Sequence, residues 1–133
     1  MTTQGNAVTI RGFEKRYRRH VAVHGVNLDI RQGEIYGLIG PDGAGKSSLM
    51  KSIAGVLAFE AGQVDVFGTT VDSDSAAERT KQRIGFMPQG LGLNLYADLS
   101  VEENIDFFAH LRLVPEASLA ERKKRLLAMT RLE

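Results

Sequence analysis

The residues best suited to chemistry lie together in one short stretch of the chain. This stretch consists of Gly40, Pro41, Asp42, Gly43, Ala44, Gly45, Lys46, Ser47 and Ser48. Residues 40–47 match the pattern G-x-x-x-x-G-K-[S/T] without a gap. Glycines allow successive backbone N–H groups to turn toward an anion, and a helix that follows adds its free N-terminal N–H groups. The pattern therefore predicts a loop that binds phosphate groups.

The side chains at the end of this stretch extend the prediction to a nucleoside triphosphate with magnesium. Lys46 would place a positive charge at the β- and γ-phosphates, and Ser47 would give a hydroxyl ligand to Mg²⁺. Ser48 would offer its N–H and hydroxyl to the α-phosphate. An ordinary strand-to-helix turn does not need this Lys-Ser pair. The loop alone does not choose among small-molecule kinases, GTPases, recombinase-like motors and other families that share it.

Apolar patterning predicts the elements that position the loop. Period-two alternation and short apolar runs predict strands at 8–13, 21–30, 34–39, 63–67 and 84–87. Helical spacing follows the loop over 45–57, and the polar residues 72–82 are expected to be partly helical. Ser100 and Glu103 form the pattern of a capping box. Pro115 favours the start of a last helix, with Leu119, Leu126 and Met129 on one face. This order predicts an α/β protein that ends in helices.

Composition limits the class of protein. The chain has 133 residues, 43% of them hydrophobic, which suits one globular domain or part of a larger one. Seventeen basic and sixteen acidic residues leave a net charge of +1, which gives no strong field for nucleic acid or an anionic membrane. There is no cysteine, and the three histidines form no metal-binding pattern. We find no secretory signal and no apolar run near the roughly 20 residues that span a bilayer, so a cytoplasmic location is expected.

Two basic runs are the only candidates for contact with RNA or ribosomes. One comprises Lys15, Arg16, Arg18 and Arg19, and the other spans 122–125. Acidic neighbours balance both runs, so we expect solvated faces and no direct binding of nucleic acid.

Three features together resemble the ABC-type ATPase domain. Tyr17 lies on a basic turn ahead of the phosphate loop, QVDVFG occupies 63–68, and IGFMPQ occupies 84–89. The resemblance implies that Tyr17 stacks on adenine through its flat ring. It also implies that Gln89 reaches Mg²⁺ and the attacking water and couples the site to a partner.

The resemblance also implies a fold and a domain division. The expected fold is an α/β P-loop NTPase of the ABC ATPase type, with an N-terminal antiparallel β part and parallel core strands with the P-loop helix. The start of a helical subdomain would follow. Residues 1–133 would form an incomplete domain, with the nucleotide-binding core and Q-loop at about 1–98 and the helical subdomain from about 99 to 133. The family's Leu-Ser-Gly-Gly-Gln signature, its acidic Walker B strand and its switch histidine do not occur in the sequence. We therefore expect this fragment alone to bind nucleotide poorly and to hydrolyse it slowly or not at all.

Finer details resemble two subfamilies. The loop variant Pro-Asp-Gly-Ala-Gly and the Met-Pro-Gln that precedes a Gly-Leu-Gly are similar to ATP-binding subunits of drug-efflux exporters of the ABC-2 type. They also resemble the first ATPase module of the ribosome-associated ATPase. The first alternative implies ATP hydrolysis in the complete protein, a transmembrane permease, a second ATPase domain and a position on the inner face of the membrane. A soluble ribosome-associated ATPase, and a truncated nucleotide-binding module without hydrolysis, remain open at this stage.

Overall fold

The computed structural model describes residues 5–90 and 95–132. The chain folds into two compact units, Met1–Phe86 and Met87–Glu133. In the described residues the first unit holds a four-stranded sheet with two helices, and the second unit holds two helices. The phosphate loop and Tyr17 both belong to the first unit.

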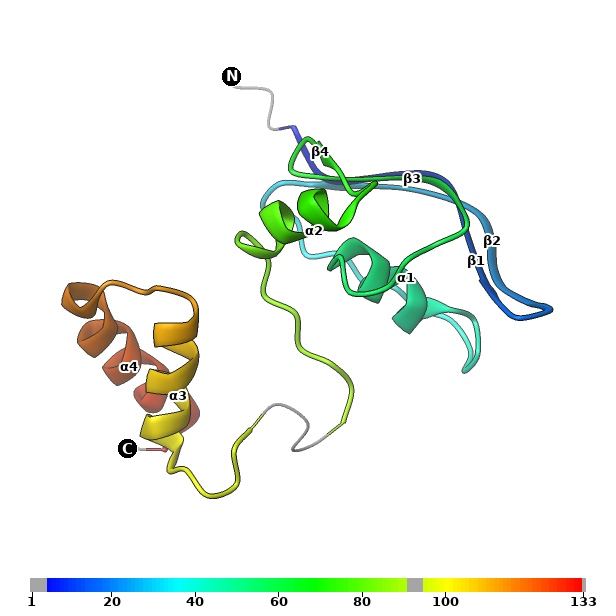
Figure 1. Ribbon diagram of the computed structural model, residues 1–133. Coiled ribbons are helices and arrows are strands. Elements are labelled where there is room, and N and C mark those ends of the chain that lie inside the picture. Colours follow the sequence, from blue (N-terminus) through cyan, green and yellow to red (C-terminus); the bar gives the residue numbers. More distant parts are fainter. Residues whose placement is uncertain (1–4, 91–94, 133) are drawn as a thin grey trace. The chain divides into compact units, whose positions relative to one another are not determined.

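The sheet of the first unit is built around a long hairpin of β1 (Asn6–Tyr17) and β2 (His20–Arg31). On its other side β1 pairs with β3 (Ala61–Val66), and β3 pairs with the short β4 (Thr69–Thr70). The order is therefore β2-β1-β3-β4, with every pair antiparallel (Figure 1). The strands that the sequence predicted at 8–13, 21–30 and 63–67 are confirmed, although the first two extend further.

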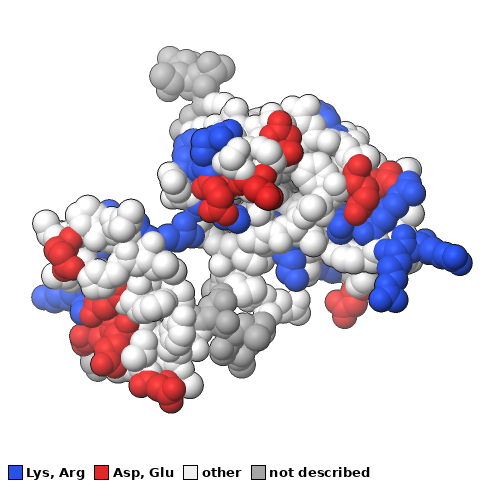
Figure 2. Space-filling model, in the orientation of Figure 1, with Lys and Arg blue, Asp and Glu red and all other residues white. Residues whose placement is uncertain are grey.

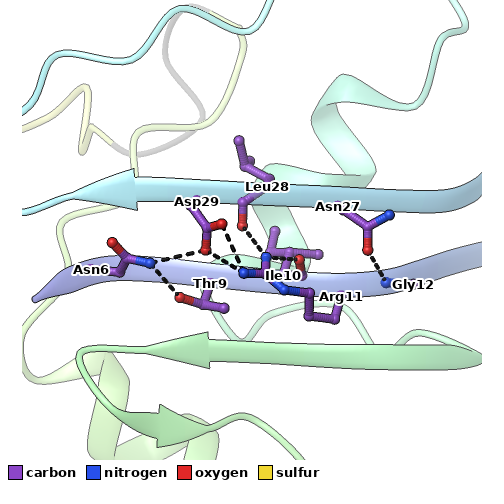
Figure 3. A network of polar contacts seen from close by, with 8 residues as sticks. All are labelled: Asn6, Thr9, Ile10, Arg11, Gly12, Asn27, Leu28 and Asp29. Carbon is purple, nitrogen blue, oxygen red and sulfur yellow. Dashed lines mark hydrogen bonds and ion pairs between the residues drawn. The ribbon is translucent and has the colours of Figure 1, made fainter.

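A bulge at Gly12 changes which residues of β1 face the helices. The register shifts between Ile10 and Phe13 against β2 and between Arg11 and Glu14 against β3, so that β1 carries one extra residue relative to each neighbour. Gly12 has φ 59°, which only glycine adopts easily, and its N–H donates to Asn27 Oδ1 at 2.9 Å (Figure 3). Because of the extra residue, Ile10 and Phe13 both become fully buried.

The same bulge determines where the end of β1 points. Side chains alternate along a strand, so Lys15 and Tyr17 lie on the same face as the buried Phe13. Lys15 is 7% exposed and Tyr17 is 47% exposed. A lysine from a run that the sequence assigned to a solvated face is thus brought inside, next to the tyrosine. The prediction of a solvated face is wrong for Lys15.

The opposite face of the hairpin carries a polar network near the N-terminus of β1 (Figure 3). The Arg11 guanidinium donates to both carboxylate oxygens of Asp29, at 2.9 and 2.8 Å. Asn6 Nδ2 donates to Asp29 Oδ1 at 2.9 Å and to Thr9 Oγ1 at 3.0 Å. The hydrogen bond from Arg11 holds the pKa of Asp29 below its usual value. About half of each partner's side chain is exposed, so this cross-strand pair contributes little to stability.

Helices α1 (Lys46–Ile53) and α2 (Asp74–Lys81) lie against one face of the sheet (Figure 1). Leu49 of α1 and Ala77 of α2 join the apolar residues of that face in one core. Helix α1 is shorter than the predicted 45–57, because Gly55 follows it with φ 69°. The buried residues of the core are Ile10, Phe13, Val23, Leu49, Val64, Val66, Val71 and Ala77.

The structure differs from the sequence prediction at the two expected parallel core strands. Neither 34–39 nor 84–87 forms a strand. Ile35 is 101% exposed, Ile39 is 94% exposed and Met87 is 88% exposed. A strand needs a hydrogen-bonded neighbour, and the sheet of the described residues contains only β1 to β4. These apolar runs of strand length therefore lie outside the sheet, although Ile84 still packs against the core of the first unit.

The second unit contains α3 (Val101–Leu111) and α4 (Glu116–Thr130). The capping box is confirmed: Ser100 Oγ accepts from Glu103 N at 3.2 Å, and Glu103 Oε2 accepts from Ser100 N at 2.7 Å. Helix α4 buries Leu119 as predicted, but its second buried leucine is Leu127. The predicted Leu126 and Met129 are 47% and 71% exposed.

On the face that Figure 2 shows, basic and acidic side chains lie in small neighbouring groups on both units. The helices of the described residues are all too short or too polar to cross a membrane.

Candidate nucleotide site

The phosphate loop is fixed in place by glycine geometry. Gly43 and Gly45 both have φ 81°, a left-handed conformation that other residues adopt at a cost. Gly45 also lies directly against β2: a Cβ atom there would be 2.2 Å from Val23 Cγ2 and 2.8 Å from the Ala22 carbonyl oxygen. A Cβ atom at Gly43 would meet nothing within 4 Å. Gly45 is thus required both by its φ and by the close approach of β2.

The N-terminus of α1 is left open for an anion. Its N-cap is Gly45, with no side-chain cap and no acidic residue in the first turn. By contrast, Ser73 caps α2 and Ser100 caps α3, and both of those helices carry acidic residues in the first turn. The first four N–H groups of a helix have no acceptor within the helix, and the positive end of the dipole lies there. This end of α1 therefore fits a phosphate group.

The Lys46 side chain folds back over the loop that precedes it. Its ammonium donates to the carbonyl oxygens of Gly40 and Pro41, each at 2.7 Å. A full positive charge is thus held beside the open helix end. The neighbouring Ser47 is exposed, and its hydroxyl has no hydrogen bond within the described part of the chain. A small cation could therefore reach that oxygen.

Tyr17 reaches the same helix from the end of β1. Its hydroxyl lies 3.0 Å from Ser48 Oγ, a hydrogen bond in which either oxygen can be the donor. Ser48 is 9% exposed, whereas the Tyr17 ring is about half exposed. The predicted adenine platform and the predicted phosphate loop are therefore in direct contact, although 31 positions separate these residues.

Two further residues beside Tyr17 were not identified from the sequence. The Lys15 ammonium lies over the Tyr17 ring, 5.1 Å from the ring centroid. Glu60, just before β3, accepts from Lys15 Nζ at 2.9 Å and from the Arg16 backbone N–H at 2.6 Å. The hydrogen bond from Lys15 holds the pKa of Glu60 below its usual value. No local pattern could have indicated this pair, because 45 positions separate its members.

The remaining predicted site residues are placed as follows. Pro41, Asp42 and Ala44 are exposed on the loop. Gln89 is exposed and belongs to the second unit. The structure brings Tyr17 together with the loop and α1, and the role of Gln89 stays a prediction.

Comparison with known proteins assigns this fold and site to a family. The family model described as "ABC transporter" matches residues 23–133, which include the whole phosphate loop. The chain therefore belongs to the ABC transporter family, and its P-loop NTPase domain is of the ABC ATPase type.

Curated relatives within this family carry different transport names. The chain is 33% identical over 126 residues to "Nod factor export ATP-binding protein I" of Ralstonia nicotianae, covering 95% of this chain and 38% of the relative. It is 38% identical over 128 residues to "Probable multidrug ABC transporter ATP-binding protein YbhF" of Escherichia coli, covering 94% and 21%. It is 37% identical over 130 residues to "Sulfate/thiosulfate import ATP-binding protein CysA" of Caulobacter vibrioides, covering 95% and 37%. The chain thus spans well under half the length of these relatives.

Solved structures confirm the fold. An ATP-binding subunit of an ABC transporter superposes with a TM-score of 0.82 at 25% identity, covering 95% of this chain and 51% of that one. A dimeric ATP-binding cassette in a post-hydrolysis state, bound to ADP and Pi, gives a TM-score of 0.74 at 27% identity, covering 91% and 54%.

Proposed function

We propose that this chain is the ATP-binding part of the nucleotide-binding subunit of an ABC transporter. The observation that carries the proposal is the hydrogen bond between Tyr17 and Ser48. It places a half-exposed aromatic ring beside the open N-terminus of α1, so that a base and a phosphate chain can be bound in one site. Tyr17 would stack on adenine, which needs a flat aromatic face.

The residues of the loop would bind the phosphates. Backbone N–H groups of the loop and of the first turn of α1 would donate to phosphate oxygens. Lys46 would exchange its two carbonyl acceptors for the β- and γ-phosphates, since a charged acceptor forms the stronger hydrogen bond. Ser48 would donate to the α-phosphate.

Magnesium would be held by the Ser47 hydroxyl, together with Gln89 and the nucleotide. Bound there, Mg²⁺ would neutralise charge on the phosphates and keep several of its waters. In the complete protein we propose ATP hydrolysis, with Lys46 and the backbone N–H groups stabilising the charge of the transferred phosphoryl group. Gln89 would orient the attacking water and transmit the state of the site to a partner.

For the complete protein we further propose an exporter of the ABC-2 or multidrug type. Two of the relatives named above are an export protein and a multidrug protein, although the third is a sulfate importer. The partners would be a transmembrane permease and a second ATPase domain, with the protein on the cytoplasmic face of the membrane. None of the relatives named above is named for ribosomes, so the ribosome-associated alternative is not carried forward.

Calorimetric titration with MgATP tests the proposal on the full chain. Lys46→Ala removes a charge-assisted contact worth about 1.5–3 kcal/mol, which corresponds to a loss of about 10- to 150-fold in affinity. Lys51→Ala is the matched control, because Lys51 is an exposed lysine in the last turn of the same helix. It should bind MgATP within about twofold of wild type. Equal losses in the two variants would refute the phosphate site.

A further inference from the structure

The ring of Tyr17 is held from two directions by residues that do not belong to the phosphate loop motif. Its hydroxyl is bonded to Ser48, and the ammonium of Lys15 lies over one face of the ring, 5.1 Å from its centroid. An ammonium within about 6 Å of an aromatic centroid is attracted to the ring. Because this cation covers one face, a base can stack only on the other.

Lys15 is in an unusual position for a lysine. Only 7% of the residue is exposed, whereas lysine side chains normally keep their ammonium in water. Ordering and burying a long charged side chain is unfavourable unless a partner compensates. The compensating partner is Glu60, whose Oε1 lies 2.9 Å from Lys15 Nζ.

Glu60 also fixes the backbone next to the tyrosine. Its second carboxylate oxygen accepts the Arg16 N–H at 2.6 Å. Arg16 lies between Lys15 and Tyr17 in β1, so one carboxylate controls both the cation over the ring and the strand that carries the ring. No other described residue combines these two contacts.

We propose that Glu60 and Lys15 are positioning residues for Tyr17, and that they determine how much the base contributes to nucleotide affinity. This inference rests on the proposed function of the site. Neither residue touches the nucleotide; each acts through the orientation of the ring. Their loss should weaken ligands that carry a base and leave a bare phosphate chain unaffected.

The test compares the affinities of the full chain for MgATP and for magnesium tripolyphosphate, which lacks the nucleoside. Glu60→Gln keeps the size of the side chain and an acceptor for Arg16, but removes the charge that compensates Lys15. Stacking of a base on an aromatic ring is worth about 5- to 150-fold in affinity, so loss of part of it should weaken MgATP about three- to tenfold. The affinity for magnesium tripolyphosphate should stay within about twofold.

Two further variants separate positioning from a general structural effect. Glu14→Gln is the matched control, because Glu14 adjoins Lys15 in β1 but pairs with the side chains of Arg16 and His24. It should leave the ratio of the two affinities unchanged. In a Tyr17→Ala background, Glu60→Gln should no longer alter MgATP binding, since the ring through which it acts is gone. If Glu60→Gln fails to fold, Lys15→Met replaces it as the test. This variant keeps an apolar stem and should show the same selective loss of MgATP affinity.

The outcomes distinguish this inference from the function on which it rests. A selective loss of MgATP affinity that disappears without the ring supports the positioning role. Equal losses for both ligands, or a loss that persists in Tyr17→Ala, overturn it and leave the phosphate site standing. If wild type binds neither ligand, the proposed function fails and the positioning role fails with it.

Discussion

Replacing Gly45 by alanine should destabilise the first unit much more than the same change at Gly43. Both glycines have φ 81°, so both replacements force alanine into a left-handed conformation. Only at Gly45 does the new methyl group meet other atoms, at 2.2 Å from Val23 Cγ2 and 2.8 Å from the Ala22 carbonyl oxygen. The pair of variants therefore separates backbone strain from the contact between the loop and β2.

The magnitude follows from these two terms. A left-handed conformation costs an L-residue about 1–2 kcal/mol. Inserting a methyl group into a well-packed place costs about 1–3 kcal/mol more. Gly43→Ala should therefore lose about 1–2 kcal/mol of stability and Gly45→Ala about 2–5 kcal/mol. Alanine also reduces the entropy of the unfolded chain, but this gain is the same at both positions and cancels in the comparison.

Urea unfolding followed by far-ultraviolet circular dichroism, without nucleotide, measures both effects. A lower midpoint with an unchanged slope reports a true loss of stability. The clash is with β2, a strand of the sheet, so the loss should appear in the transition of the first unit. Omitting nucleotide keeps ligand binding out of the comparison.

Equal midpoints for the two variants would contradict this reasoning. The methyl group at Gly45 would then be accommodated without cost, and the close approach of β2 would not be what holds the loop. A midpoint for Gly43→Ala below that for Gly45→Ala would have the same consequence.

Two predictions concern the second unit. Asn104→Ala should cost about 1–3 kcal/mol in urea unfolding, because it removes the acceptor of the Tyr96 N–H at 2.9 Å and the donor to the partly buried carbonyl oxygens of Tyr96 and Leu99. Hydrogen exchange at the Tyr96 amide should accelerate, and an unchanged rate would refute this role. The hydrogen bond that His110 Nε2 donates to the Glu116 carboxylate raises the pKa of His110. The stabilising effect of this pair is therefore full below about pH 6.5 and is lost as the pH rises through the folded-state pKa of His110. Titration by NMR should give a lower pKa for His110 in Glu116→Gln than in wild type. The urea midpoint of this variant should fall further below that of wild type at about pH 6 than at about pH 9.

The phosphate loop could be predicted from the sequence because its function depends on local geometry. Left-handed glycines, a lysine and a serine at the start of a helix act within a few residues of one another. The same holds for the capping box of Ser100 and Glu103, which depends only on a spacing of three. The alternation that predicted β2 and β3 is local in the same sense.

Apolar runs did not determine which segments pair as strands. Residues 34–39 and 84–87 have the composition of buried strands, but neither belongs to the sheet of the described residues. Pairing requires a neighbour that offers its own N–H and C=O groups, and composition cannot supply one. The strand prediction at these positions failed for that reason.

The sequence by itself determined the loop that can bind phosphates and the helix that begins there. The resemblance implied Tyr17 at the same site, but only the tertiary structure decided that Lys15 and Glu60 lie next to Tyr17. The bulge at Gly12 places Lys15 and Tyr17 on the helix-facing side of β1, and the pairing of β1 with β3 brings Glu60 to them. The Tyr17–Ser48 and Lys15–Glu60 contacts join residues that are 31 and 45 positions apart in the sequence, so they depend on strand register. One extra residue in a strand moves every following side chain to the opposite face of the sheet.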